Sequence, residues 1–144
     1  MNVVFCDIDG VLNSLPYQLS NENEDAFIDP TRLTLLKSLL DTAEAVMVLS
    51  SSWRKAWERG KEWDNTFLDA GIVIYDVTPV LGRRRDEIAA WLAAHPQVDR
   101  FVILDDADVG WGDLEPHVIV TDPINPRGLE PQHIEKALHL LNEQ

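Results

Sequence analysis

Five short apolar runs, separated mostly by segments with helical periodicity, constrain the fold of this chain more than any other feature of its sequence. The first run, Asn2–Cys6, contains Val-Val-Phe and is apolar on both faces, which is typical of a central strand in a parallel sheet. The other four runs are Ala45–Leu49, Ile72–Val77, Phe101–Leu104 and His117–Val120. Strands that alternate with helices predict an α/β fold: a Rossmann-like parallel sheet of about five strands with helices on both faces.

The segments between these runs carry signals for helix termini. Pro30 suits the first turn of a helix, and Asp29 before it can accept hydrogen bonds as the N-cap. We expect further helices over Arg84–His95, where Pro96 follows as a stop, and over Pro131–Asn142. A helical stretch, interrupted near Gly60, is expected to carry three tryptophans whose role in packing or in stacking on a base stays open: Trp53, Trp57 and Trp63.

The chain has 144 residues and no linker or repeat, so we expect one domain over residues 1–144. Residues 13–29 are rich in Asn, Ser, Pro and acids and are predicted to form an irregular, flap-like excursion. No apolar run is long enough to span a bilayer, and the first residues lack the pattern of a signal peptide. A cytoplasmic protein without membrane contact is the expectation.

The charge of the chain limits its partners. There are 12 Lys and Arg residues against 25 Asp and Glu residues, which gives a net charge of −13. Such a surface repels phosphate backbones, so broad nucleic-acid binding is disfavoured and the excess acidity mainly serves solubility. The single cysteine, Cys6, excludes an internal disulfide framework and a cysteine-based zinc site.

Polar side chains follow three of the predicted strands at the point where each strand ends. Asp7 and Asp9 come after the first strand, Ser50 after the second, and Asp105 with Asp106 after the fourth. The carboxyl ends of parallel strands lie along one edge of the sheet, where ligands bind in open α/β folds. Carboxylates gathered in one place favour a hard cation, and magnesium suits a shell of carboxylates and water.

These segments resemble the motifs of the haloacid-dehalogenase-like (HAD) phosphatases. The first, second and fourth motifs of that superfamily resemble Asp7-Ile8-Asp9-Gly10-Val11-Leu12, Val46–Ser50 and Val102–Asp106. More closely, three further segments are similar to the small HAD domain of "Swiss Army Knife" RNA-repair proteins: Ser50–Arg54, Arg84–Leu92 and Thr121-Asp122-Pro123. The resemblance extends from Val3 to the last helix.

The resemblance implies a magnesium-dependent phosphatase. Asp7 would attack phosphorus and form a phospho-aspartate, and Asp9 would act as general acid and then as general base. Ser50 would donate a hydrogen bond to a phosphoryl oxygen. Asp105 and Asp106 would hold the metal ion together with Asp7 and the backbone carbonyl of Asp9.

The third motif departs from the pattern, because the superfamily usually supplies a lysine there and none of the lysines of this chain lies near that place. The segment Arg83-Arg84-Arg85 lies at that place instead, and an arginine can hold phosphoryl oxygens with two parallel donors. The Arg-x-x-Glu-Ile spacing favours Arg84, although which of the three contacts phosphate stays open. The candidate substrate-binding residues are Gly10, Ser51, Arg54 and Arg83.

The segments between the motifs are too short for the folded cap that many relatives carry. An open site can admit a bulky phosphorylated end, and the resemblance indicates a polynucleotide end, whereas the charge of −13 indicates that a partner would have to supply nucleic-acid affinity. Two alternatives stay open: a small-molecule or nucleotide monophosphatase, and a receiver-like phospho-acceptor or binding module without turnover. The oligomeric state is not indicated.

Overall fold

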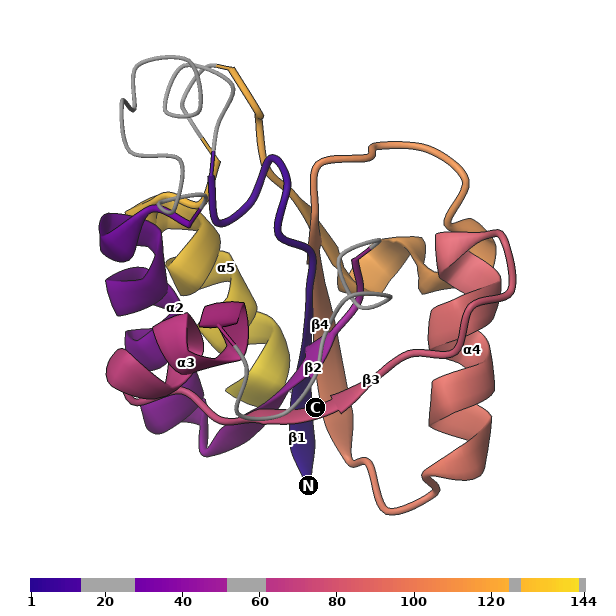
Figure 1. Cartoon of the computed structure of the whole chain (residues 1–144). Helices are drawn as coiled ribbons and strands as arrows, with labels where there is room; N and C mark the ends of the chain where they lie inside the picture. Colours follow the sequence, from indigo (N-terminus) through magenta and orange to yellow (C-terminus); the bar gives the residue numbers. More distant parts are fainter. Residues whose placement is uncertain (14–27, 52–61, 125–127, 143–144) are drawn as a thin grey trace.

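All five strands lie in one parallel sheet, in the order β3-β2-β1-β4-β5. The computed structural model describes residues 1–13, 28–51, 62–124 and 128–142 (Figure 1). The strands are β1 (Asn2–Cys6), β2 (Ala45–Leu49), β3 (Ile74–Val77), β4 (Arg100–Asp105) and β5 (Val118–Val120). The predicted α/β fold is confirmed, and the first two strands have the predicted bounds.

Helices cover both faces of the sheet, as the alternation of elements predicts (Figure 1). On one face lie α2 (Pro30–Ala43), α3 (Glu62–Asp69) and α5 (Pro131–Asn142). On the other lie α4 (Arg84–Ala94) and the 3₁₀-helix η2 (Gly112–His117). The connections that lead outward from β1 to β2 and β3 therefore use one face, and the return to β4 uses the other.

The residues of β1 separate the two apolar cores because successive side chains of a strand point to opposite faces. Val4 and Cys6 pack with α2 and α5, whereas Val3 and Phe5 pack with α4. Phe5 meets Trp91 edge to face, with ring centroids 5.4 Å apart. The central strand is thus buried from Val3 to Cys6, which fixes the position of the residues that follow it.

Helix α2 begins as predicted, since the Asp29 carboxylate accepts a hydrogen bond from the Thr31 amide at 2.9 Å. The strand expected over 72–77 begins two residues later, at Ile74. The short helix η2 was not predicted, because Gly112 and Pro116 are residues that disfavour regular helix and gave no helical periodicity.

Two of the predicted segments lie mostly in parts of the chain that the structure does not describe. The flap expected over 13–29 and the helix expected around Trp53 and Trp57 lie outside the described residues, apart from their ends. Among the helices that are described, none has the length and apolar character needed to cross a membrane.

Candidate functional site

The register of the sheet places three residues in one row: Asp7 and Ser50, which directly follow β1 and β2, and Asp105, the last residue of β4. Cys6 pairs with Leu49 of β2 on one side and with Leu104 of β4 on the other. The row continues into the loops, where the Asp7 amide donates to the Leu104 carbonyl at 3.0 Å and the Ser50 amide donates to the Cys6 carbonyl at 2.9 Å. Asp7 and the end of β4 meet where the chain connections diverge, the usual ligand position in such sheets.

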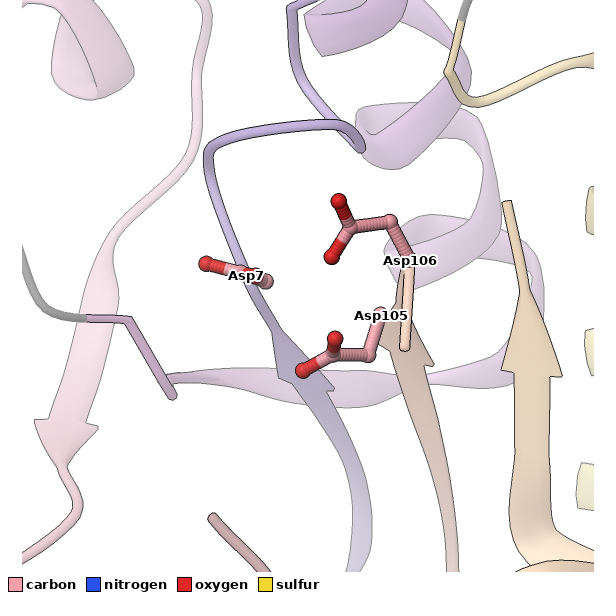
Figure 2. A group of neighbouring side chains, drawn as sticks. All are labelled: Asp7, Asp105 and Asp106. Carbon is pink, nitrogen blue, oxygen red and sulfur yellow. The ribbon is translucent and has the colours of Figure 1, made fainter. Parts of the chain in front are cut away.

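Three carboxylates converge at this point. Asp7, Asp105 and Asp106 each offer an oxygen, and these oxygens all lie within 4.8 Å of one another (Figure 2). Asp7 and Asp105 are buried, whereas Asp106 is partly exposed. Burial raises the pKa of Asp7, and burial together with the Asp7 charge raises the pKa of Asp105 to about 7.

A tight loop after β1 brings Asp106 into the group. Gly10 has a positive φ of 81°, and a Cβ at this position would collide with the Asp106 carboxylate, so the close approach requires glycine. The Gly10 amide donates to Asn13 Oδ1 at 3.0 Å. From the far end of the sheet, the buried Thr121 hydroxyl donates to the Gly10 carbonyl at 2.7 Å. One side chain from within the loop and one from the residue after β5 therefore hold this loop.

Asp9 does not belong to the group of three carboxylates. Its side chain is exposed, and Asn13 Nδ2 donates to Asp9 Oδ1 at 3.2 Å. The structure thus separates the two acids of the Asp-x-Asp segment into a buried one, Asp7, and one that solvent or a ligand can reach.

Arg84 is the arginine that the structure brings to the carboxylates. Its Nη1 atom lies 2.7 Å from Asp105 Oδ2, 3.2 Å from Asp7 Oδ2 and 2.7 Å from the Ser50 carbonyl. Burial alone would lower the pKa of the guanidinium, but the charges of Asp7 and Asp105 raise it overall. Arg84 therefore stays charged and bridges the two buried carboxylates.

Glu87, one turn along α4, holds the segment that leads to Arg84. Its Oε2 atom accepts hydrogen bonds from the amides of Leu81 at 2.9 Å and Gly82 at 3.3 Å. Its Oε1 atom lies 3.9 Å from Arg84 Nε. Glu87, which is only 4% exposed, thus fixes both the start of α4 and the side chain of Arg84.

The two serines after β2 differ in their partners. The Ser51 hydroxyl hydrogen-bonds to the Asp7 carboxylate. The Ser50 hydroxyl is buried and has no hydrogen-bond partner among the described residues. A buried donor without a partner is unusual in a folded protein, and it indicates that a ligand completes the site.

The remaining predicted residues lie at the rim of the site or beyond the described part. Arg83 is the exposed N-cap of α4, and Arg85 pairs with Asp113 at 2.9 Å and with Asp86 at 3.4 Å. Arg54 lies outside the described residues.

Sequence reasoning gave no role at the site to two buried hydroxyl residues near this row, Thr78 and Thr121, although Thr121 belongs to the segment Thr121-Asp122-Pro123. Thr121 lies one residue past the row, because Asp105 pairs with Val120 of β5 and the Thr121 amide donates to the Asp105 carbonyl at 2.9 Å. Thr78 continues the row beyond Ser50, and its hydroxyl has no partner among the described residues. Both residues directly follow a strand, so the rule that found Ser50 could have found them.

The donor set fits a divalent magnesium ion. Asp7, Asp105 and Asp106 supply the carboxylate oxygens that magnesium prefers, and among the described residues no nitrogen or sulfur ligand belongs to the group. Three carboxylates and the single Arg84 cation leave excess negative charge, which a bound cation would offset.

One comparison with known proteins identifies the family of the chain. The model of one family, described as "HAD domain in Swiss Army Knife RNA repair proteins", matches residues 3–134. Searches of curated proteins and of solved structures gave no match. The matched range contains the sheet from Val3 of β1 to the end of β5 and every residue of the site described above.

Proposed function

Since the chain belongs to the family of HAD domains in Swiss Army Knife RNA repair proteins, we propose that it is a magnesium-dependent phosphatase that forms a phospho-aspartate on Asp7. The observation that carries the proposal is the convergence of Asp7 and Asp105 on Arg84, beside the unpartnered Ser50 hydroxyl. These groups provide a nucleophile, a cation and a hydrogen-bond donor for a phosphoryl group in a space that also suits a metal ion.

In the first step, a carboxylate oxygen of Asp7 attacks phosphorus. The new oxygen–phosphorus bond forms as the bond to the leaving oxygen breaks, and Asp9 donates a proton to that oxygen. The Ile8 amide donates to Asp7 Oδ1 at 2.7 Å and keeps the carboxylate oriented. The exposure of Asp9 leaves its carboxylate accessible to a leaving group outside the buried row.

In the second step, Asp9 takes a proton from a water molecule, and this water attacks the phosphorus of phospho-Asp7. The oxygen–phosphorus bond to Asp7 breaks, and inorganic phosphate leaves. Arg84 and the Ser50 hydroxyl hold the phosphoryl oxygens in both steps. A magnesium ion held by Asp7, Asp105 and Asp106 would supply positive charge that offsets the charge of the transferring group.

The proposed substrate is a bulky phosphomonoester, such as a phosphorylated polynucleotide end. The family and the short segments between the motifs support this choice. The net charge of −13 favours a second candidate, a small-molecule or nucleotide monophosphate, because such a substrate needs no extended basic surface.

The test is release of inorganic phosphate, with magnesium and with a chelator, from an aryl phosphate, from nucleotides and from oligonucleotides phosphorylated at either end. We expect magnesium-dependent turnover that Asp7→Asn abolishes. Asp69→Asn makes the same change at an exposed site in α3 and should keep full activity. Slow release together with a persistent phosphoprotein would instead identify a phospho-acceptor module, and turnover by Asp7→Asn would refute the mechanism.

A further inference from the structure

A pocket of about 270 Å³ lies directly beside the cluster of three carboxylates formed by Asp7, Asp105 and Asp106. Its walls come from the start of α4, which contributes Arg83, Arg84 and Arg85, and from the segment after β4, which contributes Ala107, Val109 and Trp111. The volume approaches that of small-ligand sites.

The pocket and the proposed catalytic site share structural elements. Arg84 lines the pocket and also contacts Asp7 and Asp105. The Ala107 amide, on the opposite wall, donates to Asp105 Oδ1 at 3.0 Å. A substrate whose phosphoryl group lies at Asp7 therefore has this pocket as its immediate neighbour.

The three arginines of the pocket differ in how their charges are balanced. Arg84 is paired with Asp7 and Asp105, and Arg85 is paired with Asp113 and Asp86. The Arg83 side chain is exposed and makes no hydrogen bond or salt bridge with any residue in the described part of the chain. It thus brings an unbalanced positive charge to the mouth of the pocket.

Among the described residues, the segment of the opposite wall contributes one paired acid, Asp113, and its partner is Arg85 rather than Arg83. The Trp111 indole donates to the Ala107 carbonyl at 2.9 Å, which fixes the turn of this segment, and the Val109 side chain is 77% exposed. In a chain with a net charge of −13, a pocket whose charged lining consists of arginines is a local exception. This lining suits a substrate that places an anionic group in the pocket and links it, through an uncharged part of the molecule, to the phosphoryl group at Asp7.

We propose that this pocket binds a second phosphate group of the substrate through Arg83. This inference rests on the proposed function, because it assumes that the scissile phosphomonoester lies at Asp7. It deepens that function by naming the substrate class: molecules that carry another phosphate close to the one that is removed. The second phosphate can be the internal phosphodiester of an oligonucleotide or the terminal phosphate of a nucleoside bisphosphate.

The experiment compares kcat/KM for adenosine 3′-monophosphate, adenosine 3′,5′-bisphosphate and a 3′-phosphorylated dinucleotide. The wild-type protein should prefer at least one of the two substrates with a second phosphate, and the preferred one identifies its source. Arg83→Gln should lower this preference about tenfold, as expected for the loss of a charge-assisted contact, and Arg83→Lys should retain part of it. Lys37→Gln removes a charge from an ion pair on α2 and should leave the preference unchanged.

An unchanged preference in Arg83→Gln would overturn the inference without affecting the proposed function. The aryl phosphate p-nitrophenyl phosphate has no second phosphate, so its turnover reports the phosphatase alone. If no substrate is turned over, the proposed function fails, and binding of adenosine 3′,5′-bisphosphate to Asp7→Asn then tests the pocket. Addition of Arg83→Gln should weaken that binding about tenfold, and equal binding would overturn the inference.

Discussion

At the scale of single residues, the site depends on which of three consecutive arginines faces the sheet. Successive residues of a helix point in directions about 100° apart, so only one residue of Arg83–Arg85 can face the ends of β1 and β4. The structure assigns that place to Arg84, and Glu87 fixes its segment. The sequence supplied three candidates and its Arg-x-x-Glu-Ile spacing favoured Arg84, but the choice stayed open because it depends on the rotation of α4 against the sheet.

Replacement of Arg84 tests its role in binding the phosphoryl group. We expect Arg84→Ala to lower kcat about 10²–10³-fold, because it removes a preorganised donor and leaves Asp7 and Asp105 without their shared cation. Arg84→Lys should fall between this variant and the wild type, since lysine keeps the charge but loses the two parallel donors. Steady-state kinetics on an aryl phosphate measure the effect, and the exposed Lys136→Ala on α5 is the control. Wild-type kcat in Arg84→Ala would contradict the assignment.

At the scale of elements, the loop after β1 is held from the other end of the sheet. Thr121, which follows β5, donates from its buried hydroxyl to the Gly10 carbonyl, and the Leu129 amide donates to the Val11 carbonyl at 2.8 Å. The strand ends could be predicted from the sequence, because each apolar run is followed by a polar residue. The contacts between Thr121 and Gly10 could not, because nothing local marks two segments more than 100 residues apart as neighbours.

Thr121→Val removes this hydrogen bond while nearly preserving the shape of the side chain. We expect the free energy of unfolding to fall by about 1–3 kcal/mol, because the buried Gly10 carbonyl loses the donor that Thr121 supplies. Thermal or urea denaturation measures the change. Thr34→Val, which removes an exposed hydroxyl bonded to the Pro30 carbonyl in α2, should change stability by less. Equal stability of Thr121→Val and the wild type would show that this contact does not hold the loop.

At the scale of the whole molecule, the architecture was predictable and the strand order was not. Alternation of apolar runs and helices indicates a parallel sheet, and parallel strands end at one edge whatever their order. The site at that edge could therefore be predicted through Asp7, Ser50 and Asp105 without knowing that β1 lies at the centre. Periodicity carries no information about neighbours, so the order β3-β2-β1-β4-β5 required the structure.

Buried carboxylates at the site couple the stability of the whole chain to pH and to magnesium. The pKa of Asp105 is raised from 3.8 to about 7, and that of Asp7 is also raised, so the folded protein holds protons that the unfolded chain releases. Without metal, the stabilising contribution of these protons is fully present below about pH 4 and is lost as the pH rises toward 7. Magnesium binds the ionised carboxylates, so the stabilisation of the folded protein by magnesium should increase as the pH rises.

The corresponding measurement is the change in melting temperature on addition of magnesium at pH 5 and at pH 8. We expect a small increase at pH 5 and a larger one at pH 8. Asp105→Asn should reduce the increase at pH 8, whereas Asp69→Asn should leave it intact. An increase that is the same at both pH values, or that survives in Asp105→Asn, would argue against the magnesium site.

The most direct test of the account as a whole is to find the phosphoryl group on the protein. A reaction with an aryl phosphate and magnesium, quenched with acid during turnover, is reduced with borohydride and analysed by peptide mass spectrometry. We predict modification at Asp7 and at no other carboxylate, with greater accumulation in Asp9→Asn because the second step then lacks its base. Turnover that proceeds with no modification of Asp7, or with modification of a different residue, would contradict the account.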